Sequence, residues 1–335
     1  MTSGSSTTAP QRGRSWSVED LAAALSPDLE ALEAYRQDFL AKRRKGWAVL
    51  GVSFLISALT GLAAAAIEPL AGLVGVLGFA ISAAVIHHKY FGSHTAVYEY
   101  EYKRRIIGGM TKVLEPSMGY HPERGLPESW FHTSGLYSGD VDRYHSEDLF
   151  EGRIGSTNLW FAEVHAEDKR TRTDSKGRRK TYYVTIFKGL LVVADFHKDF
   201  RSDLLVTPDF AEKTFGWFGR KLQKLGGGVQ RMENPEFEKA FVVRGPDPVE
   251  ARYILTPDMQ ERLLSLRGRL GADVRFAFRN SHVFMGIPNN DDWFEPDWNQ
   301  PASSPGQMRL FLSQMATCFR IVEDLDLNTR IWTKR

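Results

Sequence analysis

The sequence predicts an α+β protein, in which a two-helix transmembrane hairpin precedes a cytoplasmic mixed α/β domain with antiparallel strands and a C-terminal helix. Three observations lead to this class. Residues 46–86 carry one charge in 41 positions, apolar segments of strand composition alternate with turn residues from 158 to 287, and helical apolar spacing follows Ser304-Pro305.

The overall composition is that of a folded chain. The 335 residues are 42% hydrophobic and 25% charged, which excludes wholesale disorder and a collagen-like repeat. Lys and Arg number 43 against 41 Asp and Glu, and this near-neutral balance argues against nucleic acid as a partner. The single cysteine, Cys318, excludes an internal disulfide and a multi-cysteine zinc site, and it is typical of a chain facing a reducing compartment.

The N-terminal region is predicted to be a tail followed by a helix. Residues 1–17 are rich in Ser, Thr, Gly and Pro, so we expect a disordered tail. Residues 18–45 are expected to form a cytoplasmic amphipathic helix, because Ser26-Pro27 supplies a cap and a first-turn proline and apolar residues follow at helical spacing.

Residues 46–91 are predicted to form the transmembrane hairpin. Glu68-Pro69 divides the apolar block and is expected at an aqueous membrane turn, because proline breaks a helix and a carboxylate at a bilayer centre costs about 3 kcal/mol. The first span is residues 47–67, about 32 Å of helix, and the second is residues 70–86, about 26 Å. The alternative is a buried pair of core helices in a soluble protein.

The flanking charges predict the orientation of the hairpin. Cations precede the first span and follow the second, whereas the turn between the spans has none. By the positive-inside rule we expect both termini in the cytoplasm and a two-pass protein of the cell membrane, with the lipid bilayer as its first partner. The flanking cations are Lys42, Arg43, Arg44, Lys45, Lys89, Lys103, Arg104 and Arg105.

Small residues recur along the first span. Ser53, Ser57 and Gly61 lie four positions apart, a spacing that permits close contact between helices. They are interpreted either as the contact between the two spans or as a contact with another membrane protein. Neither span contains Asp, Glu, Lys or Arg, which argues against a pump or an ion-coupled transporter.

The remaining chain is predicted as a connection and a folded domain. Residues 92–150 contain a helix at 95–114 and a connecting segment whose aromatic residues are expected to lie against a core. Residues 151–335 form the α+β cytoplasmic domain. Its predicted strands are 158–166, 181–187, 190–196, 204–207, 240–244, 274–278 and 282–287, and its predicted helical segments are 248–253, 257–270 and the segment after Ser304-Pro305.

Four stretches carry a resemblance to a known family. They read SGLYSGDVDRYHSEDLFEGRIGSTNLWFAEVHAE (134–167), TIFKGLLVVADFHKDF (185–200), ENPEFEKAFVV (233–243) and DPVEARYILTPDMQERLLSL (247–266). From about Tyr98 onward the chain resembles a bacterial membrane protein family known as domain of unknown function 3137. The resemblance implies two membrane helices near the N-terminus, a cytoplasmic domain without established activity, and a LemA-type membrane protein as a partner.

Motifs for catalysis, metal binding or cofactor binding are missing from the sequence, so no catalytic residue, metal ligand or cofactor is predicted. The best polar cluster is Asp195, His197 and Asp199, which alternate along an extended segment and would share one face. A metal or acid–base site is one interpretation and a polar outer face is the other. The family pattern usually has Asn where this chain has His197, which favours the polar face.

A basic loop is predicted between the first two strands of the domain. Seven of the twelve residues in KRTRTDSKGRRK are cationic. One interpretation is docking on anionic lipid head groups or on an acidic partner, and the alternative is a solvated loop that protects the hairpin edge from aggregation. The cations are Lys169, Arg170, Arg172, Lys176, Arg178, Arg179 and Lys180.

Two functions are compatible with these features. The first is a membrane-anchored cytoplasmic interaction or scaffold module of unknown biochemical activity, and the second is a membrane-tethered enzyme whose active site is not recognisable from sequence. We expect the module, because a catalytic motif is missing and an anchor is predicted.

Overall fold

A computed structural model describes the chain in two compact units. The helical unit joins Trp16–Ile106 with Glu295–Arg309, and the sheet unit contains Ile107–Phe294 and the residues from Leu310 onward. The predicted α+β class is confirmed, with a large antiparallel sheet and a C-terminal helix. The described residues are 16–68, 72–90, 94–173, 177–196, 198–209, 228–271 and 273–327.

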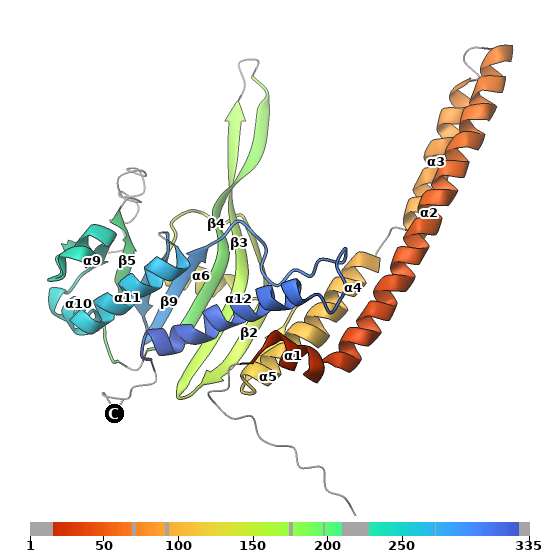
Figure 1. The fold of residues 1–335 in the computed structure, drawn as a ribbon. Coiled ribbons are helices and arrows are strands. Elements are labelled where there is room, and N and C mark those ends of the chain that lie inside the picture. The colour runs from red at the N-terminus through yellow and green to blue at the C-terminus, as the bar shows by residue number, and fades with distance from the viewer. Residues whose placement is uncertain are drawn as a thin grey trace, which may run out of the picture. The chain divides into compact units, whose positions relative to one another are not determined.

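The helical unit begins at Ser17, which caps α1 through a reciprocal capping box with Asp20. Residues 1–15 of the predicted tail lie outside the described residues. The helix predicted over 18–45 is two helices, because the chain turns at Leu25 before α2 begins. The helices are α1 (Val18–Ala24), α2 (Ser26–Ile67), α3 (Leu73–Tyr90) and α4 (His94–Tyr102), which continues as the π-helical turn η2 (Lys103–Ile107) and, in the sheet unit, as α5 (Gly108–Leu114) (Figure 1).

Helix α2 is the longest element of the chain. Its 42 residues extend for about 63 Å. Among the described helices it is the one long and apolar enough to cross a membrane, judged by length and composition. The second predicted span corresponds to α3, whose apolar part, Leu73–His88, is shorter.

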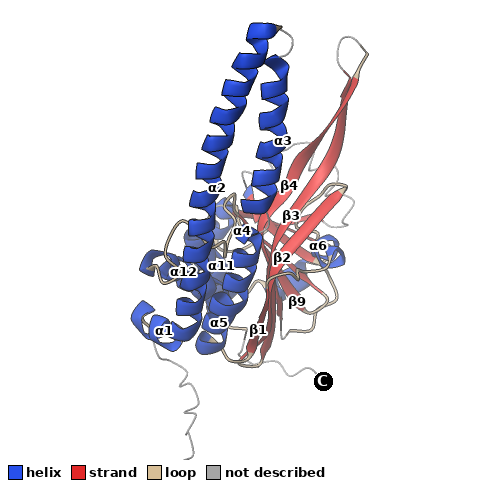
Figure 2. Cartoon of the chain, turned by 90° about the vertical axis from the view of Figure 1, so that its right-hand side faces the viewer, coloured by secondary structure: helices blue, strands red, loops and turns tan. Residues whose placement is uncertain are grey.

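The sheet unit is built on one nine-stranded antiparallel sheet with the order β1-β2-β3-β4-β9-β8-β5-β7-β6. Figure 2 shows the strands as one continuous twisted layer. The strands are β1 (Met118–His121), β2 (Arg143–Ile154), β3 (Thr157–Thr173), β4 (Arg179–Asp195), β5 (Leu204–Pro208), β6 (Gly228–Gln230), β7 (Phe241–Gly245), β8 (Arg275–Arg279) and β9 (His282–Pro288). The helices of this unit, besides α5, are α6 (Glu128–Ser134), α9 (Pro235–Ala240), α10 (Pro248–Ile254), α11 (Pro257–Leu270) and the part of α12 (Pro305–Asp324) that follows Arg309.

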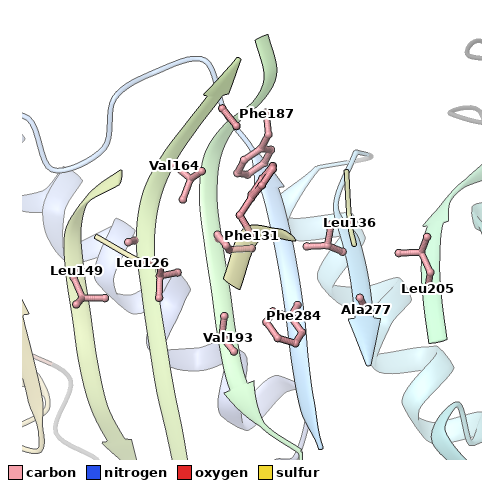
Figure 3. Packing of buried hydrophobic residues seen from close by; sticks show 13 residues of the cluster. Leu126, Phe131, Leu136, Leu149, Val164, Phe187, Val193, Leu205, Ala277 and Phe284 are labelled. Atoms are coloured by element: carbon pink, nitrogen blue, oxygen red, sulfur yellow. The ribbon is translucent and has the colours of Figure 1, made fainter. Parts of the chain in front are cut away.

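Both faces of the sheet are covered by apolar packing. On one face Phe131 of α6 packs with Phe187 and with buried residues of β2, β3, β4, β8 and β9 (Figure 3). On the other face Phe319 of α12 packs edge-on against Phe150 and Phe161. The sheet therefore forms the middle of a layered core, as expected for an α+β unit.

The sheet unit also differs from the predicted elements. The strands predicted at 181–187 and 190–196 are the single strand β4, because Gly189 (φ 144°) brings the backbone against the Ile287 carbonyl of β9 instead of forming a turn. The segment predicted as a connection at 116–150 contains β1, α6 and the first part of β2. The aromatic residues predicted to lie against a core there, Trp130, Phe131, Tyr137 and Tyr144, pack on the buried cluster of Figure 3.

Candidate functional site

Small residues make the contact between α2 and α3. The Ser53 and Ser82 hydroxyl groups are 2.6 Å apart, and Gly61 faces Gly75. A Cβ atom on Gly75 would overlap the Ser57 carbonyl oxygen and lie 2.7 Å from the Gly61 Cα. The small residues singled out in the sequence thus allow the two helices to pack on each other.

Apart from Phe54 and Phe79, whose rings meet edge-on across the two helices with centroids 5.4 Å apart, most large apolar side chains point away from this contact. Leu59, Leu62 and Ile67 are 68%, 76% and 89% exposed, and Val76 and Leu77 of α3 are exposed to a similar degree. Further exposed apolar residues on the pair are Trp47, Val49, Val52, Phe54, Leu55, Ile56, Leu73, Val74, Ile81 and Val85. The pair is therefore covered by an apolar surface much larger than a soluble monomer usually exposes.

The predicted membrane turn lies at the end of α2. Glu68 is the C-terminal cap residue of this helix, its N–H donates to the Ala64 carbonyl at 3.0 Å, and its side chain is exposed. Pro69 lies outside the described residues. The carboxylate is thus at the far end of the helix from the cations at 42–45.

The first half of α2 is a packed stalk. The ring of Tyr35 stacks on Tyr98 of α4 with centroids 6.4 Å apart. Phe39 meets the indole of Trp298 edge-on at 5.8 Å, and the Arg43 guanidinium lies 4.3 Å from the centroid of the same indole. The segment Glu295–Arg309, which we name the strap, therefore covers the stalk although it is distant in sequence.

Polar contacts fix the strap on the stalk. Glu33 pairs with Arg36 at 2.7 Å and accepts a hydrogen bond from the Ala302 N–H at 2.9 Å. The bond from Arg36 is the main cause that lowers the pKa of Glu33 to about 2. The Lys103 ammonium pairs with Glu295. Stalk and strap are thus joined by charge as well as by aromatic packing.

The predicted basic loop is largely two strands. β2 pairs with β3 only as far as Glu167, and β9 pairs with β4 only from Gly189 onward. Beyond these points β3 and β4 pair, among the described strands, only with each other. We name residues 168–173 and 177–184 the basic arm. Lys169, Arg170 and Arg172 lie on β3, Arg179 and Lys180 lie on β4, Arg178 directly precedes β4, and Lys176 lies outside the described residues.

The predicted polar cluster is centred on Asp195, at the end of β4. Its carboxylate accepts a hydrogen bond from the Asn158 side chain at 2.6 Å and lies 3.4 Å from His282 Nε2 on β9. Asp199 is exposed and has no hydrogen bond to Asp195, and His197 lies outside the described residues. His282 was not singled out from the sequence, because the pair is created by the register of β4 and β9.

This pair is arranged like a structural cross-strand contact. His282 Nδ1 is 2.7 Å from the Asn280 carbonyl, so one ring nitrogen is engaged by the turn and the other faces Asp195. The Asp195 carboxylate is in turn engaged by Asn158. Both side chains hold the end of the β8–β9 hairpin against β4.

Glu163 is a second polar group that the sequence did not single out. This carboxyl group on β3 is 8% exposed and accepts a hydrogen bond from the Trp293 N–H at 2.8 Å. Burial raises the pKa of Glu163 to about 8, and the carboxylates of Asp148 and Asp292 add to the shift. The sequence signal that could have identified Glu163 is a single acidic residue within the apolar run of this strand.

The comparisons with known proteins show a similarity between part of the chain and a family. No curated protein and no solved structure matches the chain. Residues 185–327 match the family model described as "Protein of unknown function (DUF3137)". The match begins within β4 and continues through α12, so the helix pair and the whole basic arm lie outside it. The C-terminal part of this chain, residues 185–327, is therefore similar to the DUF3137 family.

Proposed function

We propose that the protein is a membrane-anchored interaction module, in which α2 and α3 form a two-span hairpin that holds the rest of the chain at the cytoplasmic face of a bacterial cell membrane. This proposal rests on the distribution of side-chain sizes on the helix pair. Gly61, Gly75 and Ser53 lie at the helix contact, and Leu59 and Leu62 lie outside it.

Lipid explains this distribution better than water does. In water, two helices are driven together by burying large apolar side chains between them. In a bilayer that driving force is missing, and helices associate through close backbone packing at small residues while large apolar side chains face the lipid. The exposed apolar surface of the pair fits the second case.

Two spans are compatible with the helix lengths. The uncharged part of α2 is about 32 Å long, and α3 with 18 residues is about 27 Å long. A short second span is accommodated by local thinning of the bilayer and by polar residues at its end, such as His87 and His88. By the positive-inside rule, the cations at 42–45 and 103–105 support the proposal that both termini are in the cytoplasm.

The stalk and the strap support a scaffold role. Because α2 continues without interruption from the stalk into its apolar part, a rigid helix leads from the proposed bilayer to the strap. A LemA-type membrane protein is the first candidate partner. For the alternative of a tethered enzyme, the Asp195–His282 pair is the nearest arrangement to an acid–base site, and its engaged nitrogens argue for a structural role.

Carbonate extraction of membranes from cells that express the full chain tests the anchor. We expect the protein to stay in the membrane pellet. A variant with Leu59→Arg and Leu77→Arg, both at exposed positions of the pair, is expected to be released or degraded. Release of the unmodified chain by carbonate would contradict the proposal.

Labelling with a membrane-impermeant maleimide in intact cells tests the orientation. We expect a cysteine at Glu68→Cys to be labelled from outside and a cysteine at Ser17→Cys to be labelled only after lysis. The native Cys318 gives a low background, because it is buried and burial raises the pKa of its thiol. The reverse pattern would contradict the cytoplasmic location of the N-terminus.

A further inference from the structure

The basic arm is a free two-stranded ribbon. Six residues of β3 beyond its last pairing with β2 carry the arm about 20 Å past that point. Figure 1 shows the ribbon extending beyond the other strands of the sheet. A two-stranded ribbon has little core of its own and two unpaired edges, so its sequence is free to serve a surface role.

The cations of the arm differ between its base and its outer part. At the base, Arg170 pairs with Asp168 at 3.1 Å and the Lys169 N–H donates to Asp142 at 2.8 Å. Arg172, Arg179 and Lys180 have no hydrogen-bonded or ionic side-chain partner within the described residues. The outer cations are therefore available to a ligand.

The register places like charges opposite each other. Arg172 is directly opposite Lys180, and a pair of like charges at such positions destabilises a ribbon. Arg179 is opposite Thr173 and its side chain is on the other face. Cations thus surround the ribbon on both faces, which suits a broad anionic surface better than a single small anion.

The arm also concentrates charge and aromatic surface. The thirteen residues from Asp168 to Lys180 include seven cations and two carboxylates, so a chain of net charge +2 has a net charge of +5 in this segment. Tyr182 is 43% exposed beside the cations. Lys, Arg and Tyr together are typical of groups that lie at the level of lipid head groups.

We infer that the basic arm binds the phosphate groups of anionic lipids at the surface of the membrane. This inference rests on the proposed anchor, because a chain fixed in the bilayer holds the arm at a high effective concentration of lipid. It specifies the partner of the module. Nucleic acid, the other large polyanion, is less suited because the chain outside the arm has no cationic excess.

The test uses the full chain in nanodiscs with a fluorophore on Thr173→Cys. One set of discs contains phosphatidylcholine alone and the other adds phosphatidylglycerol, and both contain a lipid with a quencher on its head group. We expect quenching only in the anionic discs, decreasing as salt is raised. With Arg172→Gln, Arg179→Gln and Lys180→Gln combined, the ratio of docked to free arm is expected to fall about a hundredfold.

A matched control removes the same charge elsewhere. Arg153→Gln, Arg231→Gln and Lys239→Gln neutralise three exposed cations outside the arm, and this variant is expected to be quenched like the parent. Equal quenching in both kinds of disc, or equal loss in both triple variants, would overturn the inference. Aggregation of the arm variant with unchanged quenching would assign the cations to edge protection instead.

The same preparation separates this inference from the proposed anchor. A chain that does not enter nanodiscs contradicts the anchor, and the labelled chain mixed with anionic vesicles then tests the arm alone. A chain that enters discs without anionic quenching keeps the anchor and overturns the arm. A second experiment replaces the lipid quencher with a quencher attached to RNA. If the RNA quencher quenches the fluorophore on the arm and the lipid quencher does not, the lipid assignment is also overturned.

Discussion

In the sheet unit, Phe150 and Phe161 are fully buried and stack with ring centroids 4.4 Å apart, whereas in the helix pair Leu59 and Leu62 are more than two-thirds exposed and glycine lies at the contact. The two regions use the same kinds of apolar residue in opposite positions. The proposed anchor explains this difference by two solvents, because large apolar side chains are buried where the surroundings are water and point outward where the surroundings are lipid.

The largest contrast is expected for truncation of a large apolar side chain. Phe161→Ala in the sheet unit should lower the free energy of unfolding by about 3–5 kcal/mol, because it opens a cavity beside Phe150. Leu59→Ala in the helix pair should change it by only about 0.5 kcal/mol. Urea unfolding of both variants in nanodiscs, followed by tryptophan fluorescence, measures the difference, and similar losses would contradict it.

In the helix pair, a large loss of stability is expected when a glycine at the contact is enlarged, whereas truncation of an exposed leucine has little effect. Gly75→Val is expected to separate α2 from α3 at a cost of about 1–3 kcal/mol, because a Cβ atom there overlaps the Ser57 carbonyl. Gly51→Val is the control, since nothing lies within 4 Å of its Cβ position. Disulfide formation between Ser53→Cys and Ser82→Cys reports the contact, and unchanged crosslinking in the Gly75 variant would remove the close-packing interpretation.

Helix caps in the two units should behave alike, because both lie in water. Asn234 accepts hydrogen bonds from the Glu236 and Phe237 N–H groups, and Ser17 accepts one from Asp20. Asn234→Ala and Ser17→Ala should each cost about 1 kcal/mol. Hydrogen exchange in α9 and α1 measures the local loss. A much larger loss of stability at only one of the two caps would show that the two units also differ outside the helix pair.

The two units should also differ in the sign of their pH dependence. The pKa of Glu163 is raised from 4.5 to about 8, so the folded sheet unit holds a proton that the unfolded chain releases, and its stability falls as pH rises through this window. The pKa of Glu33 is lowered to about 2, so its stabilisation of the stalk is complete above pH 4.5 and is lost as pH falls towards 2.

Hydrogen exchange at several pH values checks both slopes. Glu163→Gln should remove the slope for β3, and Glu33→Gln should remove the slope for the stalk and the strap. A sheet unit that gains stability between pH 5 and 8 would contradict the assignment of Glu163 as a buried acid.

Local signals in the sequence predict much of the fold. Thr256-Pro257 gives the start of α11, and Asn280-Ser281, both at positive φ, form the turn between the predicted strands β8 and β9. β2 was not predicted, because a bulge at Asp148 interrupts the alternation of apolar residues. Residues 169–180 of the arm were predicted as a loop, because they are polar at every position except Gly177.

The candidate sites depend more on long-range pairing. The apolar helix pair and the cations of the arm are visible in the sequence, since each is a continuous run. The strap on the stalk and the Asp195–His282 pair join residues far apart in the chain, and only the register of β4 with β9 and the packing of Trp298 on Phe39 bring them together.

Spin labels on the reconstituted full chain test the central claim most directly. A label at Leu59→Cys is expected to collide with oxygen, which dissolves in lipid, and to be protected from a water-soluble nickel complex, while a label at Ser17→Cys should show the opposite. Accessibility of the Leu59 label to nickel, or its protection from both reagents as in a protein core, would contradict the account.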